Sequence, residues 1–233
     1  MDPAALLPCV ELAPSAPADA AVIWLHGLGA DGNDFVPIVP HLGLARGHGI
    51  RFVFPHAPSI PVTLNLGMVM PAWYDISRLD AMRHDEAGLR RSAAAIERLV
   101  EREIERGIDA RRIVLAGFSQ GGAVALHLGT RLARPLAGLL ALSTYMLVRE
   151  KLAAEGHEAN RTTPVLMLHG TEDPMVPVGW GEAARDRLRE VGHDVTWRTW
   201  PMQHEVCLEE IEVIGAWLRE RLPMLASGDR PTA

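Results

Sequence analysis

The chain has little cysteine, a single lysine and no long apolar run, and each shortage excludes a class of protein. Two cysteines in 233 residues cannot build the disulfide framework of a small secreted domain. The apolar runs stop far short of the roughly 20 residues that a membrane-spanning helix needs. The opening Met-Asp-Pro places an acid where a signal peptide carries a basic region. We therefore expect a cytoplasmic protein without stable membrane insertion.

Positive charge is also in deficit. Lysine and arginine number 23 against 29 aspartates and glutamates, which gives a net charge of -6, and no run of like charges forms a basic arm. A nucleic-acid partner is therefore not expected. With 48% hydrophobic and 22% charged residues, the composition is that of a globular protein. The length predicts one domain over 1–233, with 1–9 and 223–233 loosely ordered.

The apolar pattern predicts strands that alternate with helices. The clearest helix is 85–106, where large apolar residues recur at helical spacing among charged ones and Gly107 follows. Strands are expected at 10–12, 21–26, 50–55, 112–117, 138–143, 164–169 and 195–200, and further helices at 121–132, 181–191 and 205–221. This alternation predicts an α/β fold with a mainly parallel central sheet flanked by helices on both faces.

The strongest local signal is Gly117-Phe118-Ser119-Gln120-Gly121, which lies between a predicted strand and a predicted helix. A Gly-x-Ser-x-Gly turn in that setting holds a serine hydroxyl away from the sheet, and its glycines leave room for neighbouring backbone. The motif therefore predicts Ser119 as a nucleophile. The alternative is a glycine-rich turn that contains an incidental serine.

A nucleophilic serine needs a base to take its proton and a carboxylate to orient that base. His204 follows the last predicted strand and Asp173 follows the one before it, which gives the chain order serine, acid, histidine. Glu172 is the rival acid. Asp173 is preferred because Pro174 fixes the chain direction beside it. The sequence thus predicts a triad of Ser119, Asp173 and His204.

Acyl transfer also needs hydrogen-bond donors for the oxyanion that develops in the transition state. The glycine-rich segment 26–32 follows a predicted central strand, so its backbone N–H groups can point inward. The N–H groups of Leu28 and Gln120 are the predicted donors. A phosphate-binding loop is the alternative, but no lysine follows and the glycine spacing fits neither common phosphate motif.

No metal or cofactor is expected. His204 and Cys207 lie three residues apart, but no second pair with the spacing of metal ligands lies nearby. His26 and His169 each end a predicted strand, and we interpret both as buried structural imidazoles.

The segment 60–73 follows neither the helical nor the strand period, and it is too apolar for an ordinary surface loop. We expect this segment to line a pocket, with 64–73 acting as a lid over the substrate and core packing as the alternative for its large side chains. Trp73 fits core packing better than substrate contact. The predicted substrate-binding residues are Leu64, Leu66, Met68, Met70, Trp73, Tyr145 and Val176.

Four ordered motifs, at 26–34, 117–122, 169–174 and 201–207, resemble those of the carboxylesterase and acyl-protein thioesterase family of α/β-hydrolases, and 54–58 and 72–76 add two more. The resemblance extends from about residue 10 to 222. It implies an α/β-hydrolase fold and a cofactor-free serine hydrolase of short to medium acyl esters, often a homodimer. It assigns Ser119, Asp173 and His204 to the triad and Leu28 and Gln120 to the oxyanion hole.

The resulting hypothesis is a carboxylesterase that cleaves small-molecule esters through an acyl-enzyme intermediate. An acyl-protein thioesterase or a lysophospholipase is the alternative, because the same triad serves all three reactions. A hypothesis of a different class is an inactive hydrolase-fold protein that binds a ligand without turnover.

Overall fold

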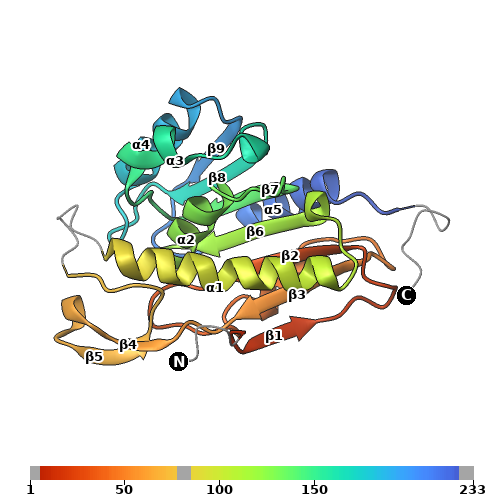
Figure 1. Cartoon of the computed structure of the whole chain (residues 1–233), viewed down its shortest axis with the longest axis horizontal. Coiled ribbons are helices and arrows are strands. Elements are labelled where there is room, and N and C mark those ends of the chain that lie inside the picture. The colour runs from red at the N-terminus through yellow and green to blue at the C-terminus, as the bar shows by residue number, and fades with distance from the viewer. Residues whose placement is uncertain (1–5, 78–84, 226–233) are drawn as a thin grey trace.

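The computed structural model describes residues 6–77 and 85–225, and in this part of the chain seven strands form one central sheet (Figure 1). In spatial order they are β1 (Cys9–Leu12), β3 (Ile50–Pro55), β2 (Ala20–Leu25), β6 (Ile113–Phe118), β7 (Gly138–Leu142), β8 (Val165–Gly170) and β9 (Val195–Trp200). All neighbours pair in parallel except β1, which pairs antiparallel with β3. The predicted mainly parallel sheet is confirmed.

Helices cover both faces of the sheet, as predicted. They are α1 (Glu86–Glu105), α2 (Gln120–Gly129), α3 (Leu152–Glu155), α4 (Val178–Glu190) and α5 (Leu208–Arg221), with short 3-10 turns at Val36–His41, Thr63–Asn65, Ala110–Arg112, Arg149–Lys151 and Glu158–Asn160. Successive strand residues face opposite sides. Ile23 of β2 therefore belongs to the core cluster that includes residues of α1, α2 and α4, while its neighbours Val22 and Trp24 belong to the cluster that includes residues of α5.

Three helix ends differ from the predicted ones by three residues. Helix α2 stops at Gly129, where the hydroxyl of Thr130 bonds to the carbonyl of Leu126. Helix α4 starts early, at Val178, because Pro177 has a backbone shape that suits a helix start. Helix α5 starts late, at Leu208, because residues 201–207 form the loop that carries His204.

The predicted aperiodic segment contains a β-hairpin that the sequence did not indicate. Strands β4 (Ser59–Val62) and β5 (Met68–Pro71) pair antiparallel, with Val62 opposite Met68. The turn uses left-handed backbone at Leu66 (φ 57°) and Gly67 (φ 77°). Prolines in both strands hide the pattern, because proline cannot donate a ladder hydrogen bond and is tolerated in such two-stranded edges.

The described part of the predicted loose N-terminus is packed. Leu7 is buried in the core, the backbone carbonyl of Pro8 accepts a hydrogen bond from His56, and Cys9 begins β1. Near the other end, the carbonyl of Pro223 accepts a bond from Arg112. Residues 1–5 and 226–233 of these two predicted segments lie outside the described residues. No helix in the described part of the chain is long and apolar enough to cross a bilayer.

Candidate active site

Ser119 occupies the sharp turn between β6 and α2. Its backbone has φ 53° and ψ -120°, which non-glycine residues rarely adopt and which holds the side chain away from the sheet. The surroundings fix this shape, because the N–H of Ser119 donates to the carbonyl of Leu142 (2.9 Å) and the hydroxyl of Thr144 donates to the carbonyl of Ser119 (2.6 Å). Ser119 itself is half-buried, so a reactant can reach it.

The two motif glycines leave space that no side chain could share. A Cβ on Gly117 would lie 2.4 Å from the backbone carbonyl of Gly121, and one on Gly121 would lie 2.5 Å from the carbonyl oxygen of His26. Both distances are well inside van der Waals contact. The glycine spacing therefore follows from the close approach of helix α2 to strands β2 and β6.

Asp173 and His204 meet above the carboxyl ends of β8 and β9. The Nδ1 atom of His204 lies 2.6 Å from Oδ2 of Asp173. The other carboxylate oxygen accepts hydrogen bonds of 2.8 Å from the N–H groups of Met175 and Val176. The Asp173 side chain is fully buried, while Glu172 points to solvent. A buried carboxylate with hydrogen bonds to both oxygens suits the role of orienting the histidine. Asp173 is that carboxylate.

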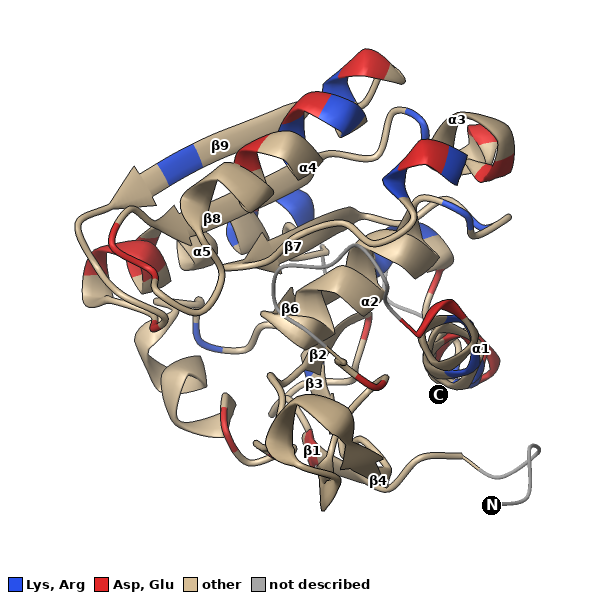
Figure 2. Cartoon of the chain, turned by 90° about the vertical axis from the view of Figure 1, so that its left-hand side faces the viewer, with Lys and Arg blue, Asp and Glu red and all other residues tan. Residues whose placement is uncertain are grey.

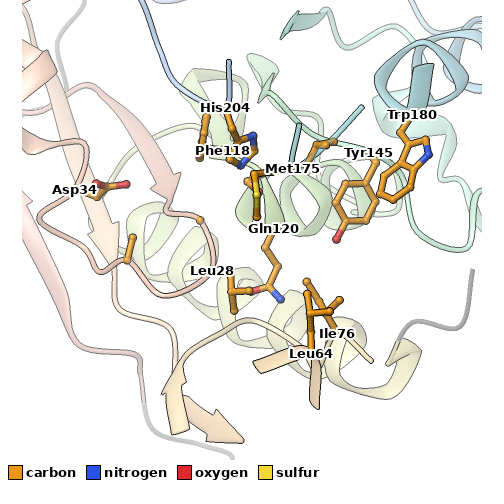
Figure 3. Close-up of a pocket in the computed structure, with 14 residues that line it drawn as sticks. Leu28, Asp34, Leu64, Ile76, Phe118, Gln120, Tyr145, Met175, Trp180 and His204 are labelled. Carbon is orange, nitrogen blue, oxygen red and sulfur yellow. The ribbon is translucent and has the colours of Figure 1, made fainter. Parts of the chain in front are cut away.

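Ser119 and His204 line the same cavity, which has a volume of about 190 Å³ (Figure 3). The imidazole packs against the ring of Phe118, with ring centroids 4.6 Å apart. Within the described residues no hydrogen bond joins the hydroxyl of Ser119 to the imidazole. Such bonds commonly tighten only when a substrate is bound.

The cavity is also lined by Leu28 and Gln120, the two predicted oxyanion donors. Among the described residues, neither of their backbone N–H groups donates to a protein acceptor. The N–H of Gln120 opens helix α2, where the helix dipole adds positive potential. On the other side, Gly29 has φ 78° and its N–H is bonded to Pro71, which fixes the loop that presents Leu28.

Three of the predicted substrate-binding residues, Leu64, Tyr145 and Val176, line this cavity. The structure adds three apolar side chains that the sequence did not single out, Ile76, Met175 and Trp180. Met175 precedes the predicted Val176 in the loop after the acid, and Trp180 lies in the first turn of α4, so the segment that follows Asp173 was the sequence feature that could have indicated both. Figure 3 shows Tyr145 beside Trp180, and Leu64 beside Ile76.

The other four predicted contacts lie elsewhere. Leu66 is 97% exposed and Met68 is 64% exposed, because the β4–β5 turn carries them away from the cavity. Met70 is half-buried near Gly29, and its sulfur lies 3.1 Å from the Asn65 amide. Trp73 is a core residue, and its ring N–H donates to the carbonyl of His26 (2.9 Å). None of the four lines the cavity described above.

His26 and His169 are structural, as interpreted from the sequence. The Nε2 atom of His26 accepts a bond from the N–H of Ala57 (3.1 Å), and Nε2 of His169 bonds to the carbonyl of Val176 (2.8 Å). Burial lowers the pKa of both imidazoles, which keeps them neutral. Across 6–77 and 85–225, no three His, Cys, Asp or Glu side chains are grouped as a metal ion would need.

Comparison with known proteins agrees with this geometry. The family model described as phospholipase/carboxylesterase matches residues 9–222, nearly the whole chain. The chain belongs to the phospholipase/carboxylesterase family. The family resemblance found in the sequence is therefore confirmed, and with it the predicted α/β-hydrolase fold.

Individual relatives indicate where in the family the chain lies. It is 45% identical over 217 residues to acyl-protein thioesterase 1 of Neurospora crassa, covering 89% of each chain. It is 40% identical to acyl-protein thioesterase 1 of Gibberella zeae, covering 88% of this chain and 91% of the relative. The crystal structure of Zea mays acyl-protein thioesterase 2 superposes with a TM-score of 0.82 at 28% identity, covering 92% of this chain and 99% of the other.

Proposed function

We propose that the protein hydrolyses acyl thioesters and esters through a covalent acyl-enzyme, with Ser119 as nucleophile, His204 as base and Asp173 as its orienting acid. One observation carries the proposal. The Asp173 carboxylate lies 2.6 Å from an imidazole whose cavity also holds a serine on a strained strand-to-helix turn. A buried acid, a histidine and a nucleophilic serine have this same arrangement in serine hydrolases of unrelated sequence.

In the first half-reaction, Oγ of Ser119 attacks the carbonyl carbon while Nε2 of His204 accepts its proton. The negative charge moves to the carbonyl oxygen, where the N–H groups of Leu28 and Gln120 stabilise it. The carbon–sulfur or carbon–oxygen bond then breaks, and the leaving atom takes the proton from His204. Water attacks the acyl-enzyme by the same route and releases the carboxylic acid.

Thioesters are the favoured substrate class, in place of the simple esters that the sequence put first. The support is the similarity to two fungal acyl-protein thioesterases at 40% identity or more. The cavity of about 190 Å³ bounds the enclosed acyl group. Since a cavity of about 150 Å³ holds one benzene, the whole cavity has room for at most about eight carbons, and the acyl group shares it with the reacting atoms and the leaving group. Longer chains would extend beyond the cavity.

A fluorophosphonate probe tests the proposed nucleophile. Stoichiometric labelling of the wild type, lost in Ser119→Ala and kept in the control Ser59→Ala, is expected because only an activated serine reacts. Ser59 is exposed in β4, away from the cavity. An unlabelled wild type would identify a binding protein and end the proposal. Matched oxygen esters and thioesters of increasing chain length then measure the substrate preference.

Two further predictions from the sequence stay predictions. Both cysteines are free, which is compatible with the reducing cytoplasm expected for this chain. The homodimer that the family resemblance implies has its own test, which is the sedimentation of the purified protein.

A further inference from the structure

The cavity has two chemically different ends. Its apolar end is formed by Leu64, Ile76, Tyr145 and Trp180, and Met175 lies between this end and His204 (Figure 3). Asp34 lines the opposite end, and it is the one Asp or Glu among the described lining residues. Figure 3 shows Asp34 on one side of His204 and Phe118, and Tyr145 with Trp180 on the other.

Figure 3 shows that Asp34 and the Tyr145–Trp180 pair lie on opposite sides of His204 and Phe118, and ring contacts link the residue next to Asp34 to this histidine. The ring of Phe35, which follows Asp34, lies 5.6 Å from the ring of Phe118, which in turn lies 4.6 Å from His204. In acyl transfer the histidine must reach the leaving atom to protonate it. With the acyl chain at the apolar end, the leaving group therefore departs along the side where Asp34 lies.

The Asp34 carboxylate is available to a ligand. Within the described residues it forms no hydrogen bond and no ion pair, and its main-chain N–H is bonded to the carbonyl of Asp31. Asp34 is exposed at the rim of the cavity, and the local desolvation of its carboxyl group raises the pKa. Charge interactions are stronger at a locally desolvated group than in bulk water.

The described loops around Asp34 carry no lysine or arginine. The described loops at the carboxyl edge, 26–35, 143–148, 171–177 and 201–207, contain no lysine or arginine, whereas Asp31, Glu172 and Glu205 are exposed there. Figure 2 looks onto this edge, where several loops have acidic positions. The charges on these described loops attract cations and repel anions.

We propose that Asp34 is a specificity-determining residue that selects substrates whose leaving group is positively charged, such as an acylated peptide with basic residues beside the acyl-carrying cysteine. This inference rests on the proposed function, because it needs an acyl group to be transferred from that leaving group. Substrates with a polyanionic leaving group, such as a nucleotide-bearing thiol, are hydrolysed poorly because the Asp34 carboxylate repels them.

The test uses one acyl group on three short cysteine peptides, with flanking lysines, serines or glutamates. The full-length protein hydrolyses each hexanoyl thioester, and the released thiol is measured. The quantity compared is kcat/KM, because it covers acylation and leaving-group departure, while the later deacylation step is common to all three peptides. We expect the lysine peptide to exceed the glutamate peptide by about tenfold or more at low salt.

Two variants and a control distinguish the effect of the Asp34 carboxylate from the effect of the overall negative charge of the protein. Asp34→Asn should reduce the lysine-to-glutamate ratio several-fold, and Asp34→Lys should reverse the order. Glu105→Gln removes the same charge from an exposed site at the far end of α1, and it should keep the ratio of the wild type. The ratio should also fall toward one at about 1 M salt, where the screening length is about 3 Å.

The possible failures are distinguishable. Hydrolysis of all three peptides with equal kcat/KM would overturn the role of Asp34 and leave the proposed activity standing. An equal loss of kcat/KM for all three peptides in Asp34→Asn would also overturn it. That result would mean that Asp34 supports the catalytic groups and does not distinguish between leaving groups. Absence of hydrolysis of even the serine peptide would refute the proposed function and this inference together.

Discussion

The side-chain oxygen of Gln120 accepts a hydrogen bond of 2.8 Å from the backbone N–H of Trp73. Its amide nitrogen donates to the carbonyl of Tyr74 at 2.7 Å, and the residue is almost fully buried. One residue thus offers its backbone N–H to the cavity and uses its side chain to hold the segment that follows the β4–β5 hairpin. The nucleophile turn and that segment are therefore coupled.

Gln120→Ala is expected to lower the free energy of unfolding by about 2 to 6 kcal/mol. The reason is that two buried backbone groups, on Trp73 and Tyr74, lose their partners at about 1 to 3 kcal/mol each. Chemical denaturation measures the change. The control is Gln203→Ala, since Gln203 is exposed and its loss should cost less than about 0.5 kcal/mol. Equal effects in the two variants would show that the bridge adds no stability.

Asp173→Asn is expected to reduce kcat for a p-nitrophenyl hexanoate by about 10⁴, because an amide at this position favours the wrong imidazole tautomer of His204. Glu172→Gln, the neighbouring exposed carboxylate, should leave kcat unchanged. Steady-state kinetics of both variants decide between the two acids. A large loss in Glu172→Gln, with little in Asp173→Asn, would reverse the assignment.

Gly121→Ala is expected to destabilise the fold by about 3 kcal/mol or to prevent folding, because its Cβ would lie 2.5 Å from the carbonyl oxygen of His26. Gly179→Ala is the matched change. A Cβ at Gly179 meets nothing within 4 Å and lies in helix α4, so it should stabilise by about 0.5 kcal/mol. Urea midpoints of the two variants should move in opposite directions. Equal midpoints would contradict the steric reason given for the motif glycine.

The contribution of Glu210 to stability is expected to fall as the pH rises from about 5 to 8, whereas the buried histidines, whose pKa values are lowered, act in the opposite direction below about pH 6.5. Burial raises the pKa of Glu210 from 4.5 to about 8, so between these values the folded state holds a proton that the unfolded state has lost. The slope is at most about 1.4 kcal/mol per pH unit. Relative to the wild type, Glu210→Gln should remove the contribution of Glu210 from the slope, and the exposed neighbour Glu209→Gln should leave the slope of the wild type unchanged. Unfolding curves at several pH values measure both, and an unchanged slope in Glu210→Gln would contradict the assignment.

Leu64→Ala is expected to move the preferred acyl chain upward by about two carbons, because it enlarges the apolar end of the cavity. Leu66→Ala should leave the chain-length profile unchanged, since Leu66 is exposed at the hairpin turn. Hydrolysis rates for a series of acyl chains check this pair. A shift in Leu66→Ala alone would mean that substrate runs over the hairpin and avoids the cavity.

Most of the fold could be predicted because it follows from local patterns. Alternating strands and helices were readable in the apolar pattern, and β3 and β9 have the predicted bounds. The β4–β5 hairpin could not be read, because prolines at positions 61 and 71 interrupt the strand pattern and only pairing between the two segments defines it. The starts of α4 at Val178 and of α5 at Leu208 depend on the geometry of the preceding loops, which the spacing of apolar residues does not predict.

The sequence by itself determined the Gly-x-Ser-x-Gly turn, the order of the three candidate catalytic residues and the family, because each can be identified from short stretches of neighbouring residues. The tertiary structure alone decided which carboxylate meets the imidazole and which side chains line the cavity. Burial at Asp173 and exposure at Glu172 and Leu66 result from packing between segments far apart in the chain. Solvent exclusion is a property of those packed surfaces, so no single stretch of sequence encodes it.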